Sequence, residues 1–111
     1  DWHAHIYFTQ ETRETAEQLR RQLVVHFPDA LFGRWHERPV GPHAQPMYQV
    51  LFAPADFATM LPFIALNRGG LSVLIHPNTQ RERDDHSHHA IWLGHQLPVD
   101  LSILPEGPAH G

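Results

Sequence analysis

The sequence has 111 residues, the length of one small domain, and its 41% hydrophobic content is enough for one core, so we expect a single domain over 1–111. A net charge of −4 and a pI near 6.2 argue against binding to a nucleic-acid backbone, which needs a basic face. The sequence contains neither cysteine nor lysine, which excludes disulfides, thiolate metal sites and Schiff-base chemistry. Without a membrane-length apolar stretch or a signal-peptide pattern, a cytoplasmic protein is expected, with neither membrane nor nucleic acid as a partner.

The first half of the sequence predicts a strand, a helix and a second strand. Side chains alternate over 3–8, which is typical of a strand; one face carries Ala4, Ile6 and Phe8, and the other His3, His5 and Tyr7. Thr12 is a candidate N-cap for a helix that extends to Phe27. Residues 30–36 predict the second strand, and the three prolines of 37–46 predict a loop of fixed shape.

The second half predicts a strand over 47–52, a helix that begins at Pro54 and a strand over 71–75. Pro62 lies inside that helix and should kink or loosen it. The order strand, helix, strand, strand, helix, strand is typical of an α+β, ferredoxin-like βαββαβ sandwich with an antiparallel sheet. The first and third strands should then be central, with the fourth beside the first.

The last third is expected to add a C-terminal loop or strand to this sandwich. Residues 77–90 read as a polar loop, and 91–93 as a short apolar plug. Apolar and polar residues alternate over 97–103, which predicts an extra edge strand or an arm that clasps a partner.

Histidine is in excess, with 11 residues, and the predicted topology brings several together. Because the fourth strand runs antiparallel to the first, His76 should lie beside His3 and His5. Imidazoles at this spacing can converge on one ion at about 2.1 Å. His86, in the loop after the fourth strand, could add a third ligand. The alternative is a polar sheet face with a solvated loop, and His3 could be frayed at the terminus.

The proline-rich loop holds further candidates. Arg38 and Tyr48 could bind a substrate, since an arginine grips a carboxylate in bidentate fashion. A surface salt bridge of Arg38 with Glu37 or Asp29 is the alternative.

Three stretches resemble the DOPA 4,5-dioxygenase family: His5-Ile-Tyr7, Pro39-Val-Gly-Pro-His43, and 71–79 (LSVLIHPNT) followed by Asp85-His86 and 90–94 (AIWLG). The resemblance extends from about residue 3 to residue 101. It implies a ferredoxin-like fold, a homodimer, and cleavage of a catechol ring by O2. The family's histidine positions correspond to His5, His43, His76 and His86.

The resemblance therefore predicts an extradiol-type dioxygenase that inserts O2 into a catecholic substrate, DOPA or a related dihydroxyphenyl compound, at non-haem Fe(II). We expect His5 and His76 as ligands, His86 as the third, and His43 as the acid–base group. A ligand set of two histidines and one carboxylate would instead recruit Asp85, Asp84 or Glu37. Three imidazoles also suit zinc, which has no redox chemistry, so zinc is a possible alternative.

Two other functions remain open at this point. One is a metal- or small-ligand-binding ferredoxin-like dimer without enzymatic activity, and the other is a zinc hydrolase or lyase.

Overall fold

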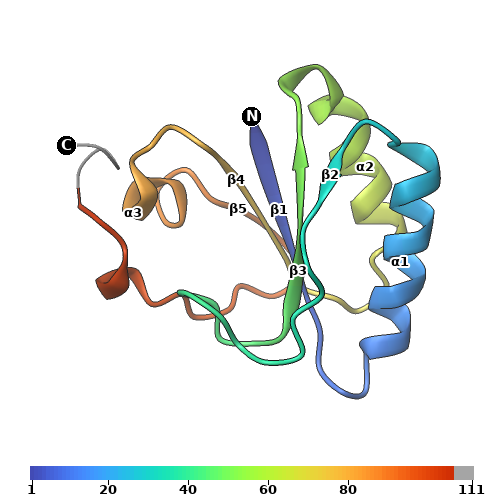
Figure 1. The fold of residues 1–111 in the computed structure, drawn as a ribbon, viewed down its shortest axis with the longest axis horizontal. Helices are drawn as coiled ribbons and strands as arrows, with labels where there is room; N and C mark the ends of the chain where they lie inside the picture. The colour runs from blue at the N-terminus through green and yellow to red at the C-terminus, as the bar shows by residue number, and fades with distance from the viewer. Residues whose placement is uncertain (107–111) are drawn as a thin grey trace.

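The computed structural model describes residues 1–106, which form a five-stranded antiparallel sheet with two helices packed on one face (Figure 1). The elements in chain order are β1 (Trp2–Tyr7), α1 (Arg13–His26), β2 (Leu31–Phe32), β3 (Met47–Phe52), α2 (Phe57–Asn67), β4 (Val73–Pro77), α3 (Glu82–Asp85) and β5 (Ile91–Leu93). Short 3-10 helices cover Pro54–Asp56 and Leu101–Ile103. The predicted α+β fold class is confirmed.

The strand order is β2-β3-β1-β4-β5, so β1 and β3 are central and β4 lies beside β1, as predicted. The register places His3 opposite His76 and Ala4 opposite Ile75. This pairing fixes which side chains of β1 and β4 share a face, because a slip of one residue would turn every side chain over.

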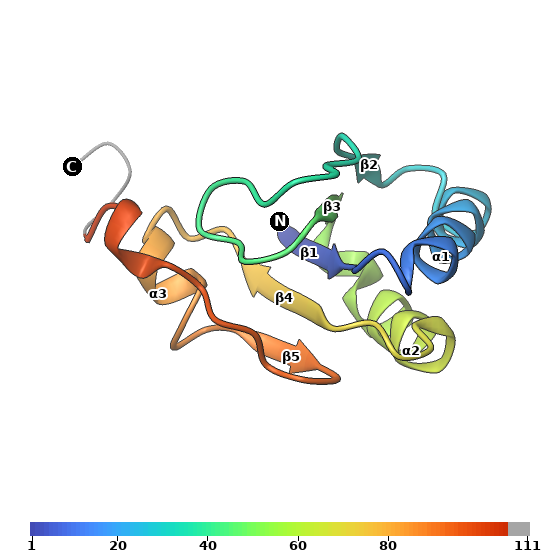
Figure 2. The same ribbon diagram turned by 90° about the horizontal axis from the view of Figure 1, so that it is seen from below.

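The face of the sheet under α1 and α2 carries the main hydrophobic core. Ala4 and Ile6 of β1 point into this core, as does Phe8 just after the strand. Leu19 of α1 and Ile64 of α2 belong to the same core. Figure 2 shows both helices gathered on this one side of the sheet. The alternation along β1 therefore separates an apolar face from the histidine face.

The other face of the sheet is covered by the chain itself. Buried Tyr7, Met47 and Leu74 pack there under Val40 of the proline-rich loop and Leu97 and Val99 of the C-terminal segment. Asp100 N donates to the Pro42 carbonyl at 2.8 Å, and residues 43 and 99 form an isolated bridge, so loop and tail hold each other. The histidines on this face are therefore enclosed as well as aligned.

Several expected boundaries differ from the structure. The second strand is only Leu31–Phe32, and the pairing expected over 30–36 is interrupted: Gly33 N still donates to the Gln49 carbonyl at 2.7 Å, and His36 forms an isolated bridge with Met47. The added strand is β5, which pairs with β4, whereas the tail over 97–103 holds one bridge and a 3-10 helix instead of an edge strand. The loop after β4 contains the short helix α3, and α2 continues through Pro62.

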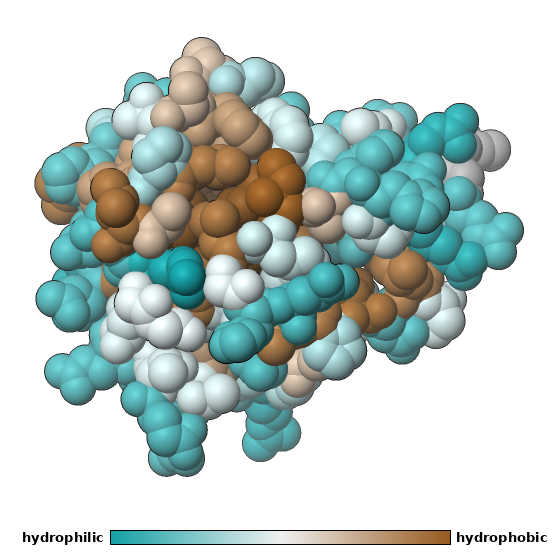
Figure 3. Space-filling model, turned by 180° about the vertical axis from the view of Figure 1, so that it is seen from behind, coloured by the Kyte–Doolittle hydropathy of each residue, from teal (hydrophilic) through white to brown (hydrophobic). Residues whose placement is uncertain are grey.

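No helix within the described residues is both long and apolar enough to cross a membrane. Figure 3 shows the molecule from behind, and an apolar area is visible on this side. In Figure 2, α2 and β5 lie on the same side of the molecule. The homodimer stays a prediction. The chain's own loop and tail cover the face of the sheet away from the helices.

Candidate metal centre

Three histidines come from the two adjacent strands β1 and β4. His5 and His76 are buried, and their Nε2 atoms lie 3.0 Å apart. His3 is the cross-strand partner of His76, with ring centroids 4.9 Å apart. The strands thus deliver these imidazoles to one point on rigid backbone, as the topology predicted.

Two more histidines reach this point from loops. The His43 ring lies 4.2 Å from that of His5, between centroids, and its Nδ1 is 2.6 Å from the Tyr7 hydroxyl. The His86 ring lies 4.1 Å from that of His76, because α3 folds back over the end of β4. All four histidines named by the family resemblance therefore meet in one cluster, together with His3.

Backbone carbonyls fix the tautomers of two members of the cluster. His76 Nδ1 donates to the Pro77 carbonyl at 2.7 Å, and His86 Nδ1 donates to the Glu82 carbonyl at 2.8 Å. In the neutral rings, Nε2 then carries the free lone pair. Histidines that bind metals are usually held in this way by an outer hydrogen bond.

Two sets of ligand atoms lie within 4.8 Å of one another in the described residues: His3, His5 and His76 in one, and His5, His43 and His86 in the other. His5 belongs to both sets. The expected combination of His5, His76 and His86 is neither of them, so the structure brings His86 to the cluster but groups it with His43. Either set could hold a metal ion.

Burial favours the neutral form of four of the five members of the cluster, His3, His5, His43 and His76. Desolvation, followed by repulsion from neighbouring histidines, lowers the pKa of His76 to about 3 and that of His43 to about 4. The same causes hold the pKa of His5 well below its ordinary value and lower that of His3. Neutral imidazoles have lone pairs available for a cation near pH 7.

The geometry fits a metal ion. Two ligands about 2.1 Å from an ion in adjacent octahedral positions lie about 3.0 Å apart, and the Nε2 atoms of His5 and His76 have that separation of 3.0 Å. His3 Nε2 and His5 Nδ1 are buried without a hydrogen-bond partner in the described residues. Unpaired buried nitrogens are costly, and the Asp1 carboxylate lies 3.8 Å from His3 Nε2, too far for a hydrogen bond, so an ion could serve as the partner of this atom.

The carboxylates considered as ligands are engaged elsewhere. Asp85 accepts hydrogen bonds from Thr79 and from His89, and this pairing lowers its pKa against the effect of burial. Glu37 pairs with Arg13, and Asp84 lies 3.2 Å from His88. The candidate centre is therefore an all-histidine site within the described residues.

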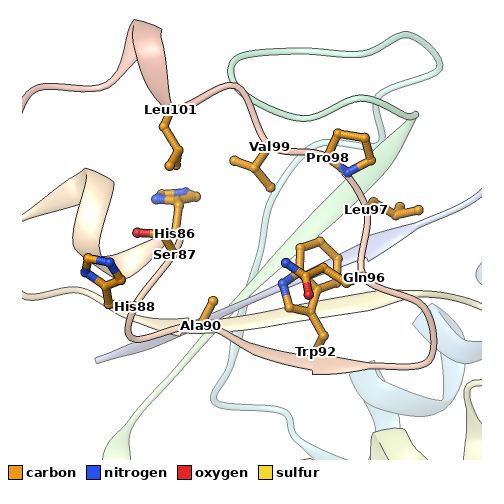
Figure 4. A pocket seen from close by; sticks show the side chains of 10 residues that line it. All are labelled: His86, Ser87, His88, Ala90, Trp92, Gln96, Leu97, Pro98, Val99 and Leu101. Atoms are coloured by element: carbon orange, nitrogen blue, oxygen red, sulfur yellow. The ribbon is translucent and has the colours of Figure 1, made fainter.

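A cavity of about 370 Å³ adjoins the cluster at His86 (Figure 4). Its apolar lining comes from Ala90, Trp92, Leu97, Pro98, Val99 and Leu101. Its polar lining comes from His86, Ser87, His88 and Gln96. The Trp92 ring also stacks on Tyr7, and the Tyr7 hydroxyl contacts His43. Trp92 in the cavity wall is therefore connected to the histidine cluster through Tyr7.

Two expected substrate residues are not part of this arrangement. Tyr48 is buried on the helix side of the sheet, where its hydroxyl donates to the Ala16 carbonyl at 3.0 Å. Arg38 is exposed in the loop and does not line the cavity. The Glu37 carboxylate, considered as a partner for Arg38, binds Arg13 instead.

Tyr7 and His3 were placed on the histidine face by sequence reasoning but were not assigned a role in the site. Both share the polar face of β1 with His5, so the alternation along the strand was the signal for them. His3 is an ordered, paired residue of β1, not a frayed end, because its strand pairs on both sides.

Comparison with known proteins supports the family predicted from the motifs. The model of the Dopa 4,5-dioxygenase family matches residues 2–103. A protein from Amanita muscaria named DOPA 4,5-dioxygenase is 34% identical over 95% of this chain, and an uncharacterized 21.2 kDa protein of Botryotinia fuckeliana is 41% identical over 90%. The chain spans 50% and 61% of the lengths of these two relatives, respectively.

A crystal structure of a candidate dioxygenase from Nostoc punctiforme has a TM-score of 0.90 to this fold at 40% identity, covering 93% of this chain and 89% of the other. The shared fold, the motif positions and the match over nearly all of the described residues agree. The chain belongs to the Dopa 4,5-dioxygenase family.

Proposed function

We propose that this protein is an extradiol-type dioxygenase that cleaves a catechol ring with O2 at a histidine-bound metal. The observation that carries the proposal is a cluster of five histidines, three of them buried, whose member His86 also lines a cavity beside Trp92. A cavity of about 370 Å³ is at the small end of the ligand-site range of about 300–1,000 Å³, which suits a single-ring substrate.

In this proposal His3, His5 and His76 hold the ion. They lie on two paired strands, and sites on rigid strands hold ligand geometry better than sites on loops. The unpaired Nε2 of His3 and the 3.0 Å spacing of His5 and His76 support this set. His3 then takes the place that the sequence analysis gave to His86.

The proposed metal is Fe(II), because the reaction needs a redox-active ion that has free coordination positions. When bound, the iron supplies the one-electron chemistry that allows O2 to react with a closed-shell ring. Three protein ligands on one side would leave the other side for the substrate and O2.

His43 serves as the base in this proposal. Its low pKa leaves it unprotonated at neutral pH, and its contact with Tyr7 holds the ring in place. Burial raises the pKa of Tyr7, so its hydroxyl stays protonated. In this role His43 Nδ1 carries the proton and donates to the Tyr7 oxygen, so that Nε2 is free to take a proton from a catechol hydroxyl.

His86 and Trp92 shape the substrate site. His86 belongs to both the cluster and the cavity lining, so it lies where a bound ring would approach the ion. Trp92 offers an aromatic wall against which a catechol ring can pack.

The experiment is anaerobic loading with Fe(II), followed by addition of a catechol panel and air. We expect oxygen uptake together with a yellow ring-opened product. Protein loaded with Zn(II) is the matched control and should consume no oxygen. Iron-loaded protein that consumes no oxygen with any catechol would contradict the proposal, and hydrolytic activity with zinc would point to a different class of enzyme.

A further inference from the structure

Two members of the histidine cluster depend on loops for their position. His43 belongs to the proline-rich loop, and His86 follows directly after the short helix α3. His5 and His76, in contrast, are held by the paired strands β1 and β4. Loop backbone is more mobile than backbone in a paired strand, so the two loop rings need a further contact to stay against the strand rings.

The C-terminal segment 96–104 contacts both of these loops. Asp100 N donates to the carbonyl of Pro42, in the proline-rich loop, at 2.8 Å. At the far end of the segment, Arg83 of α3 donates to the Leu104 carbonyl at 2.7 Å. The segment therefore connects the loop that carries one histidine to the helix that precedes the other.

A short turn joins the two attachment points. Leu101–Ile103 form a 3-10 helix, and the Asp100 carboxylate accepts hydrogen bonds from the amide and the hydroxyl of Ser102. Leu104 N donates to the Leu101 carbonyl at 3.1 Å, which closes the turn. Because the turn is held by its own hydrogen bonds, releasing the segment at one end should also loosen it at the other.

Arg83 is the side chain that holds the far end. Besides the Leu104 carbonyl, its guanidinium contacts the Ser102 carbonyl at 3.4 Å and the Glu106 carboxylate at 2.7 Å. The Glu106 side chain is 82% exposed, and ion pairs in water contribute little to stability. The charge-assisted bond to the Leu104 carbonyl should therefore supply most of the attachment.

The same segment forms one side of the cavity beside His86 (Figure 4). Five of the ten lining residues belong to it: Gln96, Leu97, Pro98, Val99 and Leu101.

We propose that the segment 96–104 is a strap that keeps His43 and His86 against the strand histidines, and that Arg83 is the positioning residue that anchors it. The inference rests on the proposed function, in which His43 is the base and His86 borders the substrate. Arg83 itself touches neither the ion nor the substrate in this account. It acts through the strap.

The test compares Arg83→Gln with two control variants. Arg21→Gln makes the same change at an exposed position of α1, on the opposite face of the sheet from the strap. Glu106→Gln removes only the exposed ion pair and leaves the carbonyl contacts of Arg83 in place.

The first measurement is amide hydrogen exchange in the metal-free protein. Exchange at Asp100 reports the attachment of the strap to the proline-rich loop, and exchange at Tyr7, whose amide donates to the Ser72 carbonyl, reports opening of the sheet. We expect Arg83→Gln to accelerate exchange at Asp100 at least about tenfold more than at Tyr7. Both controls should match the wild type.

The second measurement is the nuclear Overhauser contact between the rings of His43 and His5, also in metal-free protein. Their centroids lie 4.2 Å apart, and this contact should weaken in Arg83→Gln and persist in both controls.

In iron-loaded protein, Arg83→Gln should lower kcat/KM for a reactive catechol about tenfold, because a small displacement of the base or the cavity wall slows the reaction. The Fe(II) affinity should stay within about threefold of the wild type, since strands and not loops hold the ion. A merely structural role would lower iron affinity and turnover together.

The outcomes separate this inference from the proposed function. Unchanged exchange at Asp100 in Arg83→Gln, or equal acceleration at Asp100 and Tyr7, would overturn the strap. Local release of Asp100 with an intact ring contact and wild-type turnover would overturn the positioning role. If the wild type cleaves no catechol, the proposed function is wrong, and exchange and ring contact in the metal-free protein still decide the inference.

Discussion

The two faces of the sheet differ in chemistry although the same strands form both. On the helix side, β1 contributes Ala4 and Ile6 to a continuous apolar core. On the other side the same strand contributes His5 and Tyr7, both buried but polar. Burying apolar surface stabilises the fold, whereas burying imidazoles costs free energy unless hydrogen bonds or a bound ion satisfy their nitrogens.

Under the proposed function, one face supplies the main hydrophobic core and the other the metal site. Truncating two neighbouring buried residues of β1 should therefore have different effects: loss of metal and turnover on one face, and loss of folding stability on the other. His5 and Ile6 provide the most direct pair, since they are adjacent and almost fully buried.

His5→Ala should abolish both metal binding and turnover, because His5 belongs to both candidate ligand sets. We expect a loss of at least about a thousandfold in kcat/KM, comparable to the loss of an essential catalytic group. Metal content by elemental analysis and oxygen uptake provide the measurements. Full iron occupancy in this variant would contradict the site.

Ile6→Ala is the matched change on the helix face. It should lower the free energy of unfolding by about 2–5 kcal/mol, as for other truncated core residues. The folded fraction should keep its metal content. Denaturant titration and elemental analysis check this, and loss of metal from folded Ile6→Ala protein would show that the two faces are not separate.

His3→Ala and His86→Ala distinguish the two ligand sets. His3→Ala should weaken iron binding by about 10- to 100-fold or more, whereas His86→Ala should retain the ion and lose turnover. Titration with Fe(II) under argon measures the affinity of each variant. The reverse pattern would transfer the ion to His5, His43 and His86.

Tyr7→Phe should have a smaller effect, because it removes only the hydroxyl that contacts His43. We expect about a 10- to 100-fold loss in kcat and little change in KM, since the ring of residue 7 still packs on Trp92. A merely structural role would lower stability without moving the pH profile of kcat. Steady-state kinetics across pH therefore decides the role of Tyr7.

Acidification should destabilise the metal-free protein gradually. The folded pKa values of His76 and His43, about 3 and about 4, lie below the unfolded value of about 6.5, so the unfolded chain binds more protons as pH falls. The free energy of unfolding should fall from pH 6.5 to pH 4 by up to about 1.4 kcal/mol per pH unit for each histidine. Denaturation at a series of pH values tests this, and a flat profile would contradict buried neutral histidines.

Much of the fold could be predicted from the sequence because its signals are local. The alternation of apolar and polar side chains predicts the strand β1, and the helical spacing of Leu19 and Leu23 predicts α1; both elements are present in the structure. The crossover rules also predict His76 beside β1, where the structure has it. The position of β5 could not be predicted, since three apolar residues carry no period and its pairing with β4 is tertiary.

The candidate site was predicted less completely than the fold. Strand histidines follow from register, but the placement of His86 depends on how Asp85 and Thr79 fold the loop around α3. Tyr48 was misplaced because proximity to the loop in sequence does not determine the face of a strand. Its hydroxyl is on the helix side, where it donates to Ala16.

The most direct test of the account is an anomalous difference map at the iron edge from Fe(II)-loaded crystals. The account predicts one strong peak about 2.1 Å from nitrogens of His3, His5 and His76, on the histidine face of the sheet. A peak coordinated by residues outside the histidine cluster, or no peak in protein that has taken up iron, would contradict it.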